Sequence, residues 1–139
     1  MGSTFQSTVI NASADKVWQT IRDFHDMSWA SGVITKCVPV GNLKGNQIGA
    51  RRILNDAFEE TLLEVNDGDR RLFYSIDDGP EPVGATSDYK GLISVRPVTD
   101  GDQAYVEWSS TWSGLDAETE AFCAPLYVAI LADLKSRFD

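Results

Sequence analysis

The sequence has few of the side chains that bind metals or build catalytic triads. Its two cysteines, Cys37 and Cys123, form no C-x-x-C motif, and His25 is the only histidine. A zinc site or a redox dithiol needs more ligands than these. No serine stands in a G-x-S-x-G motif, so nothing supports a nucleophilic triad around His25. We therefore expect reduced core thiols, no metal and no cofactor.

Long apolar runs and an excess of positive charge are missing as well. No stretch reaches the roughly 18 consecutive apolar residues that suggest a membrane helix, and Met1 to Asn11 lacks the pattern of a signal peptide. The chain carries 12 lysines and arginines against 21 aspartates and glutamates, a net charge of −9. Such a charge repels phosphate backbones. These features predict a cytoplasmic protein with no membrane span and no nucleic-acid partner.

The composition that remains is that of a globular domain. Hydrophobic residues make up 42% of the 139 residues and charged residues 24%, close to the average of soluble proteins. A chain of this length buries roughly two thirds of its unfolded surface without help from metals or disulfides. We find no repeat, linker or low-complexity tract, so we expect a single domain over residues 1–139.

The first third of the chain predicts a strand and two short helices. Phe5–Ile10 alternates loosely, and Ser13 is placed to cap a helix that begins at Ala14. Apolar residues then recur with helical spacing at Val17, Trp18, Ile21 and Phe24. His25–Gly32 is predicted to form a short second helix or turn.

The middle of the chain predicts a meander of strands separated by tight turns. Asp67-Gly68 and Asp100-Gly101 each stand between two apolar runs, which is the strongest local signal for a β-hairpin. The predicted strands are Val33–Val40, Arg51–Leu54, Phe58–Val65, Leu72–Ile76, Tyr89–Val98 and Tyr105–Trp112. With Phe5–Ile10 they make about seven strands.

The C-terminal segment predicts the only long helix. Residues 117–138 place an apolar stripe on one face, made of Phe122, Leu126, Ala129, Ile130 and Leu134. An antiparallel sheet with one apolar face packs that face on such a stripe, and a curved sheet leaves space beneath the helix. We therefore predict an α+β fold in which a curved antiparallel sheet wraps around a long C-terminal helix, with a cavity between them.

Four segments resemble a known superfamily in their order and spacing. They are Ala12–Trp18, Glu60–Asp67, Asp88–Val95 and Tyr105–Trp112. Together they resemble the START-like or Bet v 1-like (SRPBCC) superfamily, in particular the polyketide cyclase/dehydrase group and the plant abscisic-acid receptors. The resemblance spans nearly the whole chain and implies the helix-grip fold. It is less specific for activity, because this scaffold serves carriers, receptors and cyclases alike.

The resemblance also implies a set of pocket residues. Glu60, Tyr89 and Glu107 correspond to pocket residues of the family, as do Phe122 and Leu126 on the long helix, and Trp29 stands where the family closes its pocket mouth. Trp29 serves equally well as an anchor for the short helix. The receptors hold an acidic ligand with a lysine, but the corresponding segment here, residues 30–33, has none. Reception of an acidic hormone is therefore not expected.

Reasoning from the residues agrees with the resemblance for Glu60 and conflicts with it for Glu107. Glu60 shares a strand face with Phe58 and Leu62. Burial alone would turn Trp108 and its face of the last strand inward and leave Glu107 in water. We follow the resemblance and expect Glu107 in the cavity; otherwise Trp108 and Trp112 line it instead.

Three functions are compatible with this site. The first is binding of a small hydrophobic molecule, such as a polyketide, isoprenoid or lipid fragment, with Tyr74 and Trp29 among its contacts. The second is an enzyme of the cyclase or dehydratase type, with Glu60 or Glu107 as acid and base and Tyr89 polarising a carbonyl. The third is an interaction protein without ligand chemistry. The sequence leaves turnover and oligomeric state open.

Overall fold

The first and last strands of the chain lie side by side in one sheet. The computed structural model describes residues 1–139, and strand β1 pairs antiparallel with β7 from Gly2 opposite Trp112 to Ile10 opposite Ala104. The seven strands follow the order β1-β7-β6-β5-β4-β3-β2, and every pair is antiparallel. The strands are β1 (Gly2–Ile10), β2 (Cys37–Val40), β3 (Arg51–Leu54), β4 (Phe58–Asn66), β5 (Arg71–Asp78), β6 (Ser87–Val98) and β7 (Gln103–Ser113). The prediction of a curved antiparallel sheet is confirmed.

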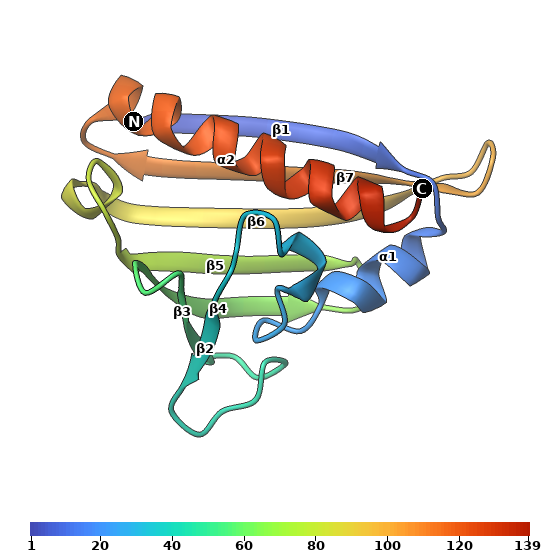
Figure 1. The fold of residues 1–139 in the computed structure, drawn as a ribbon, viewed down its shortest axis with the longest axis horizontal. Coiled ribbons are helices and arrows are strands. Elements are labelled where there is room, and N and C mark those ends of the chain that lie inside the picture. Colours follow the sequence, from blue (N-terminus) through green and yellow to red (C-terminus); the bar gives the residue numbers. More distant parts are fainter.

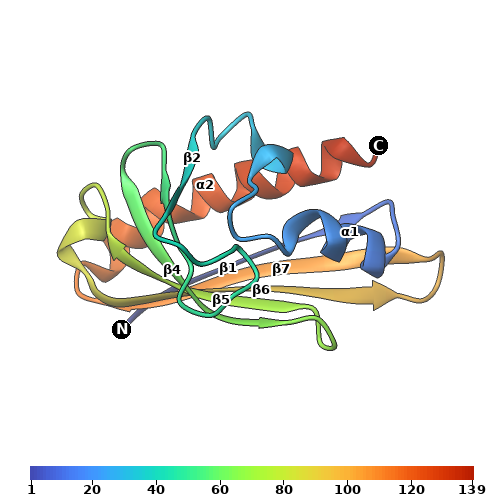
Figure 2. The same cartoon turned by 90° about the horizontal axis from the view of Figure 1, so that it is seen from below.

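Two layers make up the molecule. The long helix α2 (Asp116–Arg137) crosses one face of the sheet, and the short helix α1 (Ala14–Ile21) lies on the same side (Figure 1). Seen from below, strands β2 to β4 curl toward α2 (Figure 2). Two single-turn 3₁₀ helices, Ser28–Ala30 and Val83–Ala85, stand in connections. None of the helices is long and apolar enough to cross a membrane.

The aspartate-glycine turns close the two long hairpins as predicted. Gly101 has a φ of 102°, a left-handed conformation that glycine adopts without steric cost. In the β4–β5 turn, Asp67 also accepts hydrogen bonds from Trp18 Nε1 at 2.8 Å and from Arg22 Nε at 2.8 Å. This turn therefore fixes α1 against the end of the sheet.

Local signals set α1 and its connection to β2. Ser13 caps the helix by accepting a hydrogen bond from the Lys16 amide at 3.2 Å, as the sequence predicts. The predicted start of the next strand at Val33 is wrong. The amides of Val33 and Ile34 both donate to Ala30 O, so the chain still turns here after the 3₁₀ helix, and the strand begins at Cys37.

The buried face of α2 is rotated relative to the predicted stripe. Ile130 and Leu134 are buried as predicted, whereas Phe122 and Leu126 are only half-buried. The fully covered positions are Thr119, Cys123, Tyr127, Ile130, Leu131 and Leu134. Tyr127 enters the core because buried partners take its hydroxyl group, and the rotation leaves Leu126 at the edge of a hollow.

Candidate functional site

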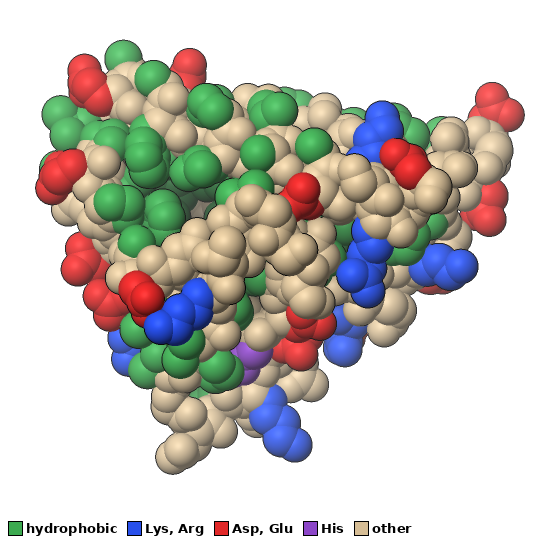
Figure 3. Space-filling model, viewed as in Figure 1, with side chains coloured by type: hydrophobic (Ala, Val, Ile, Leu, Met, Phe, Trp, Pro, Cys, Tyr) green, Lys and Arg blue, Asp and Glu red, His purple; other side chains and the backbone are tan.

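A cavity of about 90 Å³ lies between the sheet and α2. In the space-filling view, hydrophobic side chains gather around a hollow beside the N-terminal half of α2 (Figure 3). Twelve of the 15 lining residues are hydrophobic. The lining comprises Met27, Val33, Ile34, Arg52, Leu54, Asn55, Phe58, Glu60, Tyr74, Ile76, Trp108, Cys123, Leu126, Tyr127 and Ile130.

The only charged groups in the wall are Arg52 and Glu60, and they bind each other. Arg52 Nε and Nη2 donate to Glu60 Oε1 at 2.9 and 2.6 Å. Arg52 Nη1 donates to the carbonyl oxygen of Phe24 at 2.9 Å, and the guanidinium carbon lies 3.8 Å from the centre of the Phe24 ring. The side chains are only 3% and 5% exposed. Three hydrogen bonds and an aromatic face thus compensate Arg52 for its lost hydration.

The strand register explains why this pair faces the cavity. Arg52 stands directly opposite Glu60 in the β3–β4 ladder, and Leu54 stands opposite Phe58. Because side chains alternate between faces, all four point inward together. The placement of Glu60 beside Phe58 agrees with the strand-face reasoning from sequence.

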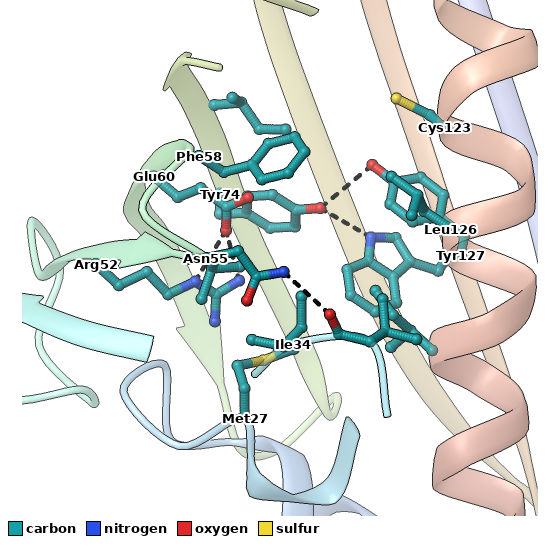
Figure 4. Close-up of a pocket in the computed structure, with 15 residues that line it drawn as sticks. Met27, Ile34, Arg52, Asn55, Phe58, Glu60, Tyr74, Cys123, Leu126 and Tyr127 are labelled. Carbon is teal, nitrogen blue, oxygen red and sulfur yellow. Dashed lines mark hydrogen bonds and ion pairs between the residues drawn. The ribbon is translucent and has the colours of Figure 1, made fainter. Parts of the chain in front are cut away.

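Burial raises the pKa of Glu60, and the attraction of Arg52 offsets part of this effect. Both hydrogen bonds from Arg52 end on Oε1, and Oε2 accepts none. In the close-up, one carboxylate oxygen turns away from Arg52 toward the side of Phe58 and Tyr74 (Figure 4). The cavity therefore contains a carboxylate that is held in place and has one oxygen free.

A cluster of aromatic hydroxyl groups forms the part of the wall beside α2. Trp108 Nε1 donates to Tyr74 Oη at 2.9 Å, and the Trp108 ring stacks on Tyr127 with centroids 4.8 Å apart. The Tyr127 hydroxyl lies 2.7 Å from Ser110 Oγ and also contacts the hydroxyl of Tyr89. Burial raises the pKa of Tyr74, Tyr89 and Tyr127, so all three stay neutral in the folded protein.

Gly91 makes room for the Tyr74 ring. The two residues stand opposite each other on β6 and β5. A Cβ atom on residue 91 would overlap the Tyr74 ring. The hydroxyl end of the Tyr74 ring therefore lies close to the backbone of β6, and this close approach sets the position of the hydroxyl group in the cavity wall.

The prediction that Glu107 faces the cavity is wrong. Val106, Trp108 and Ser110 are buried, whereas Glu107 is half-buried on the outer face and accepts a hydrogen bond from Tyr105 Oη at 3.1 Å. The β6–β7 ladder runs without a bulge past this position. Strict alternation therefore holds, and the apolar face of β7 is the inner one, as burial alone indicates.

The other predicted residues are distributed around the cavity rather than all within its wall. Tyr74 and Leu126 line it. Phe122 is half-buried, with its ring 6.5 Å from that of the lining residue Phe58. Tyr89 is buried behind Tyr127, so Glu60, Tyr89 and Glu107 do not share one pocket.

Trp29 and Trp112 also lie outside the wall. The ring centroids of Trp29 and Trp108 lie 6.5 Å apart, and the Trp29 indole nitrogen donates to Asp26 O at 3.1 Å. Trp29 therefore anchors the short helix and does not close the pocket mouth. Trp112 stacks on Tyr89 with centroids 5.4 Å apart. Of the two tryptophans named as substitutes for Glu107, only Trp108 reaches the cavity.

Sequence reasoning missed Arg52 and Tyr127. Strand alternation shows that one member of Arg51-Arg52 must face inward, but the partner of that arginine depends on the register with β4. Tyr127 lies one helical turn after Cys123, a spacing that indicates a shared face. Strand alternation at Arg51-Arg52 and the helical spacing of Cys123 and Tyr127 are thus the sequence signals that could have identified these two residues.

The comparisons with known proteins agree with this fold. The sequence matches the family described as polyketide cyclase/dehydrase and lipid transport over residues 1–139. No curated protein matches it significantly. A solved protein of Nitrosospira multiformis is 39% identical with a TM-score of 0.96, covering 99% of this chain and 96% of that one.

More distant structures show the same architecture. The XoxI protein of Bacillus cereus is 26% identical with a TM-score of 0.81, covering 99% of this chain and 96% of its own. The major latex-like protein 151 of Panax ginseng, 12% identical with a TM-score of 0.82, covers 99% and 97% and shows the fold alone. On this evidence the chain belongs to the polyketide cyclase/dehydrase and lipid-transport family and has the Bet v 1-like helix-grip fold.

Proposed function

We propose that this protein binds a small hydrophobic molecule in the cavity between the sheet and α2. The observation that carries the proposal is the cavity itself, which is lined by 12 hydrophobic residues and has a volume of about 90 Å³. An apolar space of this kind is where ligands of a globular protein bind by default. The description of the family, which includes lipid transport, supports the same reading.

The size of the cavity limits the ligand. Pockets for drug-sized molecules measure roughly 300–1,000 Å³, so the volume of about 90 Å³ suits a single-ring compound or a short aliphatic fragment. A whole polyketide, isoprenoid or lipid chain would require the rim to move. Phe58 and Phe122, both half-buried and with rings 6.5 Å apart, are the side chains at the rim that would separate.

A pair of helix variants tests the proposal. Leu126→Trp fills the cavity, whereas Val128→Trp adds the same bulk at a position that is 53% exposed on α2. With 4-nitrotoluene as the probe, calorimetry should show saturable one-to-one binding to the wild type and to Val128→Trp, and none to Leu126→Trp. Equal binding to all three proteins, or no binding to the wild type, would contradict the proposal.

A second candidate is proton-transfer catalysis at the same site. Glu60, whose pKa burial raises, faces the cavity that the Tyr74 hydroxyl group also lines. A carboxylate base beside a phenol that polarises a carbonyl is the arrangement needed to remove a proton next to that carbonyl. This candidate differs from the mechanism predicted from sequence, because neither Glu107, the predicted acid or base, nor Tyr89, the predicted carbonyl polariser, lines the cavity.

Deuterium exchange distinguishes the two candidates. An enzyme would accelerate exchange of the α-protons of cyclohexanone in D₂O, as followed by proton NMR, and Glu60→Gln would abolish the acceleration while cyclohexanone still bound. A pure binding protein would bind cyclohexanone and leave its exchange rate at the buffer value.

A further inference from the structure

The cavity has one cation, and its own wall neutralises that cation. Arg52 directs two hydrogen bonds to Glu60 Oε1 and a third to Phe24 O. No other lysine, arginine or histidine lines the cavity. An incoming anion therefore finds no uncompensated positive charge, and it would meet the carboxylate of Glu60 in an apolar space, where repulsion between like charges is strong.

The same pair leaves one hydrogen-bond acceptor without a partner. Glu60 Oε2 accepts no hydrogen bond within the protein, although Glu60 is only 4% exposed. Because Arg52 already balances the charge of Glu60, this oxygen can accept from a neutral donor, and no further charge then enters the apolar cavity. The hydrogen bonds from Arg52 keep the carboxylate in one orientation, so the acceptor is fixed before a ligand arrives.

We propose that the cavity selects a neutral ligand with a hydroxyl group, which donates its hydrogen to Glu60 Oε2, and that it rejects the ionised form of the same ligand. The inference rests on the proposed binding function and specifies the polar end of its ligand. The ligand class is then a small phenol or alcohol with an apolar body, and not a carboxylate.

The size of the selectivity follows from the type of bond. A site built to accept from a hydroxyl group discriminates strongly against an isostere that lacks it, since its own polar atom is then left unsatisfied. Hydrogen bonds to charged groups lie at the strong end of the range measured in proteins. We therefore expect a preference of about tenfold or more for the hydroxyl compound.

Two probes of nearly equal shape test this selection. 4-Nitrophenol carries a hydroxyl group that ionises near neutral pH, and 4-nitrotoluene has a methyl group in its place. At slightly acidic pH, calorimetry should show that 4-nitrophenol binds about tenfold or more tightly than 4-nitrotoluene. The visible absorbance of 4-nitrophenolate should show that binding shifts the ionisation of 4-nitrophenol to higher pH.

Two glutamate variants locate the effect. Glu60→Gln removes the charge that compensates Arg52, so the ionisation of bound 4-nitrophenol should shift to lower pH instead of to higher pH. Glu59→Gln is the matched control, because Glu59 pairs with Arg51 at 3.7 Å and its side chain is 41% exposed. This control should behave as the wild type does.

The outcomes separate the inference from the function on which it rests. Equal affinity of the wild type for both probes, or a downward shift of the ionisation, would overturn the inference and leave the cavity as a binding site. If neither 4-nitrophenol nor 4-nitrotoluene bound saturably, both the inference and the proposed binding function would be overturned. The wild-type measurements decide the matter even if Glu60→Gln fails to fold.

Discussion

The two arginine-glutamate pairs on β3 and β4 show how differently the two faces of the sheet use the same chemistry. On the outer face, Arg51 and Glu59 are 3.7 Å apart, and their side chains are 48% and 41% exposed. One residue further along each strand, Arg52 and Glu60 are 2.6 Å apart and 3% and 5% exposed. The same pair of residue types is an ordinary surface contact on one face and the charged part of a cavity wall on the other.

Position along a strand, and not residue type, decides what a charged side chain does in this sheet. A surface pair in water contributes about 0–1 kcal/mol to stability. A buried pair gains little over an apolar replacement, but loss of one partner leaves an unpaired buried charge. Tyrosines divide in the same way, since Tyr74, Tyr89 and Tyr127 are buried and Tyr105 is half-buried beside Glu107.

The largest expected effect is unfolding in alkaline solution. Burial raises the pKa of Tyr74, Tyr89 and Tyr127 above the ordinary tyrosine value of about 10. Their contribution to stability is therefore complete below pH 10 and falls as the pH rises beyond it, by about 1.4 kcal/mol per pH unit for each tyrosine. Absorbance at the tyrosinate band should rise for these three residues together with the loss of helical circular dichroism. If all three tyrosines ionised while the protein stayed folded, the inner face of the sheet would not protect them from water as the comparison with the outer face requires.

The next effect concerns the cation of the buried pair. Arg52→Met should destabilise the protein by about 3–5 kcal/mol, because Glu60 then stays buried without its partner. Arg51→Met should cost less than about 1 kcal/mol. Urea denaturation of both variants measures the difference. The double variant Arg52→Met, Glu60→Met should recover most of the loss, and two single variants of equal stability would contradict the comparison.

A third prediction separates filled and hollow parts of the inner face. Leu134 is 1% exposed within the core, whereas Leu126 lines the cavity. Leu134→Ala should cost about 2–5 kcal/mol, and Leu126→Ala should cost less because it removes fewer contacts. Thermal denaturation of the two variants provides the measurement. Equal losses would mean that the space beside Leu126 is packed solidly.

The smallest expected effect is that of Glu107→Gln. Glu107 lies on the outer face and accepts a hydrogen bond from Tyr105 there. Its replacement should change stability by no more than about 0.5 kcal/mol and leave the binding of 4-nitrophenol unchanged. Titration calorimetry of the variant checks both the affinity and the stoichiometry, and a changed affinity would place Glu107 within reach of the ligand after all.

The sequence predicts the fold well because its signals are local. Alternating apolar residues and the turns at Asp67-Gly68 and Asp100-Gly101 mark the two long hairpins, and the meander that they build is confirmed. Local patterns do not fix the rotation of α2, because Leu126 and Tyr127 are both acceptable core residues. The choice between them depends on hydroxyl partners on β5 to β7 that only the folded chain brings together.

The site is less predictable for the same reason. Strand alternation correctly places Glu60 inward, and burial correctly indicates that Trp108 and not Glu107 faces the helix. The resemblance to related pockets points the other way for Glu107 and is wrong there. Arg52 becomes the partner of Glu60 only through the register of β3 with β4, which is a property of tertiary structure.

The most direct test of the central claim is to locate a bound ligand. Nuclear Overhauser contacts between 4-nitrophenol and the protein should appear at the side chains of Ile34, Leu126 and Ile130, which line the cavity. The ring protons beside the hydroxyl group should lie nearest to Glu60. Contacts confined to exposed side chains such as Phe5 or Ile48, with none from the cavity wall, would contradict the account.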